Sequence, residues 1–285
     1  MTILITGASG QLGHLVVESL LARGVAPETV LAGARDLAKV ADLAERGVRT
    51  ARVDYDDPAT LETALTGVDS VLLISASEPG KRLAGHRNVI EAAAAAGIGK
   101  LVYTSAPRAT TFDWALGAEH RATEQAIAAS GIPAVVVRNN WYIENYLADV
   151  QRSADSGVIA ASVGDGRIAP ASRADFAEGA AVVLIEDGHL GEVYEFAGDD
   201  RIGYDDIAAA AAEVAGRDVT YLRLSTADHI AALESAGLDN GTAQFVAGID
   251  TGIRDGVLDI DDRTLSRLIG RPTTSFVDGI RAALA

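Results

Sequence analysis

Three glycines lie three residues apart near the start of the chain, at Gly7, Gly10 and Gly13. An apolar run over residues 2–5 precedes them, and an amphipathic run over residues 11–23 follows them. A strand that turns into a helix leaves free amides at the helix N-terminus, and these attract a phosphate. We expect the first glycine to permit the turn, the second to admit a pyrophosphate and the third to let helix and strand pack closely. The pattern predicts a dinucleotide site. A plain strand–turn–helix junction is the alternative, because the spacing differs from the usual GxGxxG.

The residue after the second expected strand, residues 30–34, indicates which dinucleotide is preferred. Enzymes that choose NAD place an acidic residue there to hold the ribose 2′-hydroxyl. This chain has Arg35, whose guanidinium forks onto a 2′-phosphate and so favours NADP(H). Asp36 follows immediately, which keeps NAD(H) open as the alternative.

Asp54 and Tyr55 follow the third expected strand, where the adenine of a bound dinucleotide would lie. The carboxylate of Asp54 is able to accept a hydrogen bond from the exocyclic amine, and the ring of Tyr55 is able to stack on the base. The alternative is that both residues only form a turn at the end of the strand.

The elements that must position these residues alternate regularly up to residue 138. Short β-rich runs indicate strands, and longer patterns between them indicate helices. Such alternation predicts a parallel sheet covered on both faces, with right-handed crossovers and ligands beyond the carboxyl ends of the strands. We therefore expect an α/β fold with a doubly wound parallel-sheet Rossmann domain. The expected strands are 2–5, 30–34, 48–53, 70–74, 100–104 and 134–138, and the expected helices are 11–23, 37–45, 58–65, 81–96 and 117–130.

The alternation ends after residue 140. Residues 157–168 are rich in glycine and poorly patterned. We expect an NAD(P)-binding Rossmann-like domain over residues 1–198, of which residues 151–198 weave between the two parts, and a smaller, mostly helical C-terminal domain over residues 199–285. The expected elements here are helices at 144–153, 173–187, 204–215, 227–236, 242–253 and 275–284, and strands at 192–197 and 220–224.

The composition excludes several kinds of site and partner. The chain has 285 residues, of which 48% are hydrophobic and none is cysteine, so no disulfide or thiolate site exists. The five histidines show no metal-ligand spacing, which predicts no metal. A formal charge of −16 disfavours nucleic acids and anionic membranes as partners. Since neither a signal peptide nor a transmembrane run is recognisable, we expect a cytoplasmic protein.

Segments distributed along essentially the whole chain resemble the NmrA-like, atypical short-chain dehydrogenases. The glycine motif is generic, but the segments at 138–146 and 268–273 are specific. Within this family the chain is most similar to bacterial NADPH-dependent quinone reductases, and triphenylmethane reductases are near relatives. The segments that carry the resemblance are residues 5–13, 53–55, 72–77, 86–90, 103–105, 138–146, 173–175 and 268–273.

The resemblance implies an NADPH-binding large domain, a smaller C-terminal domain and a substrate cleft between them. It implies hydride transfer to quinones or similar electron-poor aromatic acceptors, without a flavin, and leaves a homo-oligomer open. The family also includes non-catalytic NADP(H)-binding redox sensors, which are the alternative. Carried over by position, the residues beside the cofactor are Gly7, Ala8, Ser9, Gly10, Gln11, Leu12, Arg35, Ser75, Ala76 and Ser77, while Asn139, Asn140, Trp141, Tyr142, Ile143, Glu144 and Arg173 line the nicotinamide end and the domain junction.

The helix expected at 117–130 departs from ordinary short-chain dehydrogenases, which carry a Tyr-x-x-x-Lys pair there. Here the two positions are His120 and Glu124. The departure argues against alcohol–ketone chemistry, whereas a quinone accepts hydride readily and its product takes a proton from water. His120 is a weak candidate for a proton donor. The alternative is a helix histidine that pairs with Glu124 or faces solvent.

Two further features have open interpretations. Trp141 and Tyr142 follow the sixth expected strand and are able to stack on a flat aromatic substrate, or else they fill the domain interface. Tyr142 is also a weak catalytic candidate. For His86 we expect helix capping or structural hydrogen bonding rather than chemistry.

Overall fold

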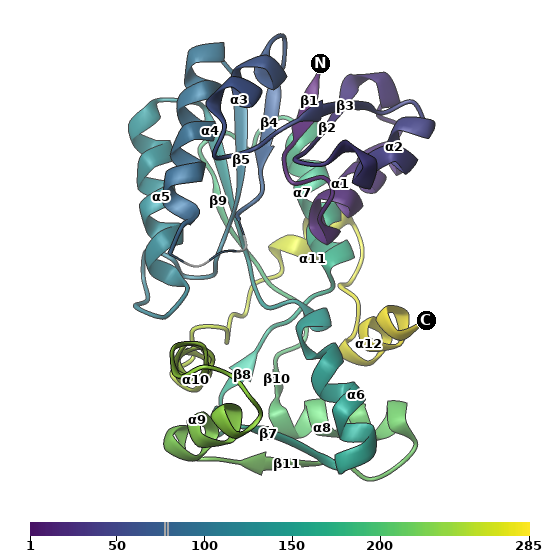
Figure 1. The fold of residues 1–285 in the computed structure, drawn as a ribbon. Coiled ribbons are helices and arrows are strands. Elements are labelled where there is room, and N and C mark those ends of the chain that lie inside the picture. Colours follow the sequence, from purple (N-terminus) through teal and green to yellow (C-terminus); the bar gives the residue numbers. More distant parts are fainter. Residues whose placement is uncertain (77, 79) are drawn as a thin grey trace. The chain divides into compact units, whose positions relative to one another are not determined.

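The computed structural model describes residues 1–76, 78 and 80–285, and the chain divides into two compact units (Figure 1). The first unit comprises residues 1–109, 118–139 and 173–194, and the second comprises residues 110–117, 140–172 and 195–285. The expected domain boundary between residues 198 and 199 stays a prediction, because a division into compact units does not test which segments fold independently.

The first unit is built on a seven-stranded sheet in the order β3-β2-β1-β4-β5-β6-β9. The neighbouring pairs from β3 to β6 are parallel. The order reverses direction at β1, which is the doubly wound arrangement predicted from the sequence. The strands are β1 (Ile3–Ile5), β2 (Val30–Ala34), β3 (Arg49–Arg52), β4 (Ser70–Leu73), β5 (Lys100–Ser105), β6 (Ala134–Asn139) and β9 (Val193–Phe196).

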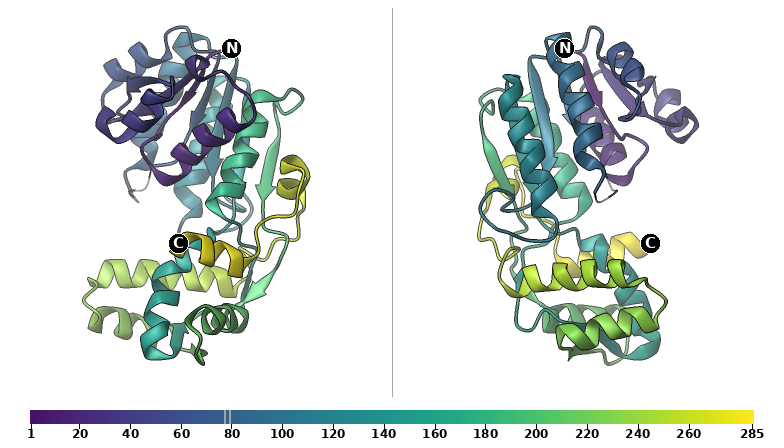
Figure 2. Two further views of the ribbon diagram at one scale, coloured as in Figure 1. Left: turned by 90° about the vertical axis from the view of Figure 1, so that its right-hand side faces the viewer. Right: turned by 60° about the vertical axis from the view of Figure 1, so that its left-hand side comes forward.

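Helices cover both faces of this sheet, as Figure 2 shows from two sides. Helices α1 and α7 pack together on one face, and α3 packs against α4 on the other. Strands β1, β2 and β4 are buried throughout, as expected for parallel strands enclosed by helices. The helical elements are α1 (Gln11–Ala22), η1 (Pro27–Thr29), η2 (Leu37–Val40), α2 (Ala41–Glu45), α3 (Pro58–Leu65), α4 (Arg82–Ala96), α5 (Gly117–Ser130) and α7 (Arg173–Ile185).

The second unit is mostly helical, as expected, with two small sheets. Strand β11 pairs with β7 in parallel, and β10 pairs with β8 antiparallel. The elements are η3 (Ile143–Tyr146), α6 (Leu147–Ser156), β7 (Val158–Ala161), β8 (Arg167–Ile168), β10 (Ile202–Gly203), α8 (Tyr204–Ala215), β11 (Thr220–Arg223), α9 (Thr226–Ser235), α10 (Asn240–Arg254), α11 (Thr264–Ile269) and α12 (Phe276–Leu284).

The structure corrects three details of the sequence reading. The segment 157–168 contains strands β7 and β8, which are too short to show a period of two. The helix expected at 37–45 consists of a 3₁₀ turn followed by α2. Helix α11, six residues long, was not expected. In the described part of the chain, no helix has the length and hydropathy needed to cross a bilayer.

Candidate functional site

The three glycines form a tight turn between β1 and α1, and each has a different geometry. Gly7 has a positive φ of 62°, which favours glycine. Gly10 has extended backbone angles, and its amide donates to the carbonyl of Gly7 at 2.9 Å. At Gly13 a Cβ atom would lie 2.4 Å from the Gly7 oxygen, so only glycine lets the helix approach the turn. The expected roles of the first and third glycines are therefore consistent with the geometry.

The N-terminus of α1 fits a pyrophosphate. No side chain caps the helix, and the amide of His14 donates to the carbonyl of Gly10 at 3.0 Å. The amides that precede His14 in the first turn have no intrahelical acceptor. A Cβ atom on Gly10 would approach the Gly7 oxygen to 3.3 Å, a tight contact that favours glycine at this position. Ser9, Gly10 and Gln11 are exposed, while Ala8 and Leu12 are buried beneath them.

At the end of β2, the structure assigns different roles to Arg35 and Asp36. The carboxylate of Asp36 accepts from the amide of Ala38 at 3.0 Å and so caps η2. Arg35 is exposed, and within the described residues it has no acidic partner. A capping carboxylate beside a free guanidinium fits the 2′-phosphate of NADP(H) better than the 2′-hydroxyl of NAD(H).

Three side chains, from the residue after β1, from β5 and from α4, fix the segment that follows β4. The amide of Ile74 donates to Thr6 Oγ1 at 3.1 Å, that of Ser75 to Thr104 Oγ1 at 2.9 Å, and that of Ala76 to His86 Nε2 at 3.0 Å. The expected cofactor residues Ser75 and Ala76 are thus held in one conformation. Ser77 lies outside the described residues.

Tyr55 has a structural role in the described contacts. Its hydroxyl donates to the carbonyl of Ile74 at 2.8 Å and lies 2.5 Å from Thr6 Oγ1. Its ring meets that of His86 edge-on, and burial raises the pKa of the phenol. Asp54 Oδ1 accepts from the amide of Asp56 at 3.2 Å, which forms the strand-end turn. Adenine recognition by this pair stays a prediction.

His86 belongs to a buried hydrogen-bond chain. Because its Nε2 accepts from the Ala76 amide, the neutral ring carries its proton on Nδ1 and donates to Thr123 Oγ1 at 3.0 Å. Thr123 in turn donates to the carbonyl of Glu119 at 3.0 Å. Burial, followed by the charge of Arg82, lowers the pKa of His86 to about 4. Structural hydrogen bonding was the expected role of this residue.

His120 does not pair with Glu124 and does not face solvent. It is buried, its Nε2 accepts from Arg82 Nη1 at 3.3 Å, and its Nδ1 lies 2.8 Å from the hydroxyl of Tyr103. Burial, followed by the charges of Arg82 and His86, lowers the pKa of His120 to about 3. The alternative interpretation, a histidine that pairs with Glu124 or faces solvent, was wrong on both counts, because the ring points toward Tyr103 on β5. As a proton donor it would have only a neutral N–H.

Glu124 instead forms an ion pair that sequence reasoning missed. Arg138 donates to both of its carboxylate oxygens, from Nε at 3.0 Å and from Nη2 at 2.7 Å, and Ser105 Oγ donates to Oε1 at 2.6 Å. Both ionic side chains are 9% exposed. Ser105 and Arg138 are register partners on β5 and β6, so the pair ties α5 to the carboxyl edge of the sheet.

The remaining expected site residues lie in different units. Buried Asn139 ends β6 in the first unit, and Arg173 begins α7 there. In the second unit, Asn140 Nδ2 donates to the carbonyl of Leu258 at 3.2 Å. The half-buried residues there are Trp141, Tyr142 and Glu144, and buried Ile143 packs against Gly279. None of these contacts tests a role toward the cofactor.

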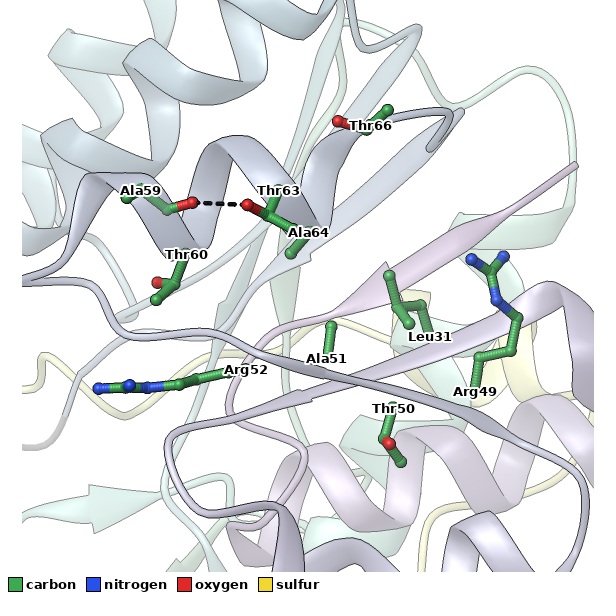
Figure 3. A pocket seen from close by; sticks show the side chains of 10 residues that line it. All are labelled: Leu31, Arg49, Thr50, Ala51, Arg52, Ala59, Thr60, Thr63, Ala64 and Thr66. Carbon is green, nitrogen blue, oxygen red and sulfur yellow. Dashed lines mark hydrogen bonds between the residues drawn. The ribbon is translucent and has the colours of Figure 1, made fainter.

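Two other features do not supply a reaction site. A cavity of about 450 Å³ lies between β3 and α3, but it contains none of the expected site residues (Figure 3). In the second unit, Ser162 Oγ and Asp250 Oδ2 both lie near the same nitrogen of His229, at 3.1 and 2.9 Å. A hydrolytic triad needs the serine and the carboxylate on opposite ring nitrogens, so this buried cluster is not one.

Comparisons with known proteins agree with this geometry. A family described as NAD(P)H-binding matches residues 7–187. Quinone oxidoreductase 2 of Escherichia coli K12 is 47% identical over 278 residues, which cover 98% of this chain and 97% of that protein. The crystal structure of the E. coli NADPH-dependent quinone oxidoreductase with NADPH superposes with a TM-score of 0.95 at 46% identity, over all of both chains. The Citrobacter triphenylmethane reductase complexed with NADP(H) gives a TM-score of 0.93 at 31% identity, over 99% of this chain and 100% of that chain.

The family match covers more than half of the chain, and the relatives above 30% identity cover nearly all of it. The glycine turn, the uncapped α1 and the doubly wound sheet are the features such a family requires. The chain therefore belongs to the NAD(P)H-binding family.

Proposed function

We propose that this protein is an NADPH-dependent oxidoreductase that transfers hydride to quinones or similar electron-poor aromatic acceptors. The observation that carries the proposal is the uncapped N-terminus of α1 beside Arg35, with Asp36 engaged as a helix cap. This arrangement fits NADPH, and the 47% identical relative named quinone oxidoreductase 2 supports the choice of acceptor.

In this proposal, the chain's own residues bind and orient the cofactor. The first amides of α1 hold the pyrophosphate, and Arg35 holds the 2′-phosphate. Thr104 and His86 fix the backbone of Ser75 and Ala76 beside the cofactor. Bound NADPH supplies the hydride. The reduced ring takes one proton from water, because His120 is neutral, so positioning supplies most of the acceleration.

The second candidate is an NADP(H)-binding redox sensor without turnover. The observation that favours it is the buried network at the positions of the usual tyrosine and lysine, where His120 contacts Tyr103 and Glu124 contacts Arg138. For either function we propose a small-molecule partner and a cytoplasmic location, and the oligomeric state stays a prediction.

The test mixes the protein with NADPH and 1,4-benzoquinone and follows the loss of reduced-nicotinamide absorbance against a reaction without protein. Catalysed loss that disappears in Gly10→Val supports the oxidoreductase. Tight NADPH binding with no catalysed loss, across quinones and triphenylmethane dyes, would instead support the sensor.

A further inference from the structure

Free arginines are informative in a chain whose formal charge is −16. Several arginines pair with carboxylates, as Arg46 does with Glu18 and Arg23 with Glu178. Within the described residues, Arg35, Arg49 and Arg52 have no such partner. A guanidinium that stays exposed and unpaired among many acidic residues is available to an anionic ligand.

Arg52 lies beside the end of β2. In the parallel pairing of β2 and β3, Arg52 is the register partner of Ala34, the residue directly before Arg35. Neighbouring strands lie about 4.8 Å apart, so the backbones of the two arginines are close at the carboxyl edge of the sheet. Arg49 pairs with Leu31, at the other end of the same strand.

Arg52 lies near the carboxyl end of the edge strand β3, and the segment that follows Arg35 packs against this strand. Ala51 and Val53 pack into the core cluster beneath α3. Arg52 is exposed on this edge strand and also lines the cavity between β3 and α3, while η2, which begins at Leu37, packs against β3. Figure 3 shows Arg52 extending beyond the carboxyl end of β3, whereas Arg49 extends from the other end.

We infer that Arg52 is a second ligand for the cofactor's 2′-phosphate, beside Arg35, and a determinant of the preference for NADPH over NADH. The inference rests on the proposed function, because it assumes NADP(H) in the site. A phosphate dianion offers three oxygens, which two forked guanidiniums bind from different sides. Arg35 and Arg52 approach from adjacent strands, which is the geometry that such a clamp requires.

The experiment measures the dissociation constants of NADPH and NADH for the wild type, Arg35→Ala, Arg52→Ala and the matched control Arg49→Ala. For Arg35→Ala we expect NADPH to bind roughly 10- to 100-fold more weakly, as for loss of a hydrogen bond to a charged group. For Arg52→Ala we expect NADPH to bind about 5- to 30-fold more weakly, a smaller loss because Arg52 lies on the edge strand of the sheet. NADH affinity should change by less than about twofold in both, and Arg49→Ala should match the wild type.

Two further measurements separate charge from shape and isolate the phosphate. Arg52→Lys keeps the charge and loses the fork, so its NADPH affinity should lie between those of the wild type and Arg52→Ala. Adenosine 2′,5′-bisphosphate should show the Arg52→Ala loss, and adenosine 5′-phosphate should not. Circular dichroism checks that each variant is folded.

The outcomes distinguish this inference from the proposed function. If the wild type binds both cofactors and Arg52→Ala weakens NADPH no more than Arg49→Ala does, or weakens NADH equally, Arg52 is not a ligand and the proposed function still stands. If the wild type binds neither cofactor, the proposed function fails as well.

Discussion

The two halves of the sheet's carboxyl edge are built in different ways. After β1, backbone groups form the candidate cofactor site: the glycine turn over residues 7–13 and the uncapped start of α1. At β4, β5 and β6, side chains form it. Thr104 and His86 hold the amides after β4, and Glu124 ties α5 to Arg138.

The difference decides what each half tolerates. A backbone-built turn accepts side-chain changes except where a new Cβ atom meets the chain or the ligand. A network of buried side chains depends on every partner and on protonation, because an unpaired buried polar group is costly. Variants in the two halves should therefore fail in different ways.

The largest effect is expected from breaking the buried ion pair. In Glu124→Leu the guanidinium of Arg138 stays buried without its carboxylate, which should cost about 3–5 kcal/mol of the free energy of unfolding. Glu124→Leu combined with Arg138→Met should recover much of that loss, because the buried positive charge is removed together with the carboxylate. Urea denaturation of Glu124→Leu, Arg138→Met and the double variant measures the free energy of unfolding of each. Equal losses in the single and double variants would show that packing, and not charge, holds α5 to the sheet.

Two glycines in the other half should separate folding from binding. In Gly13→Ala the new Cβ atom would lie 2.4 Å from the Gly7 oxygen, and we expect a loss of about 3 kcal/mol in the free energy of unfolding. In Gly10→Val the backbone angles suit valine and the new Cβ atom would lie 3.3 Å from the Gly7 oxygen, a contact that a small shift relieves, so the protein should fold while NADPH binding is lost. Thermal unfolding and cofactor titration are measured together. A folded Gly10→Val with unchanged NADPH affinity would contradict the pyrophosphate assignment.

The side-chain half should also be sensitive to acid. The pKa of His86 is about 4 in the folded protein and near 6.5 when unfolded, so the unfolded chain binds more protons between these values. Its contribution to stability is full above about pH 6.5 and falls as the pH drops toward 4, by roughly 3 kcal/mol in all. His86→Gln keeps an acceptor for the Ala76 amide and does not titrate. Its unfolding free energy should therefore depend less steeply on pH than that of the wild type, and equal slopes would refute the role of His86.

The smallest effect on catalysis is expected at His120. Because its ring is neutral and hydrogen-bonded to Tyr103 and Arg82, His120→Ala should lower kcat for a quinone by less than about 10²-fold. Steady-state kinetics at several pH values measures this, and NADPH titration confirms that the cofactor still binds. Abolished turnover with intact NADPH binding would make His120 a proton donor and overturn the mechanism.

Much of this protein was determined by local sequence. The alternation of short apolar runs with helical patterns specified the doubly wound sheet, because each element carries its own period. The glycine turn was equally readable, because Gly7, Gly10 and Gly13 lie within one strand–turn–helix unit. The same holds for Arg35, which directly follows its strand.

Only the tertiary structure decided the side-chain half. Glu124 meets Arg138 and Ser105 because α5 packs across β5 and β6, and no sequence spacing indicates that pairing. Arg52 lies beside Arg35 only because β3 pairs with β2 in that register. Such contacts join residues far apart in the chain, and packing geometry chooses among many possible partners, so a single sequence does not specify them.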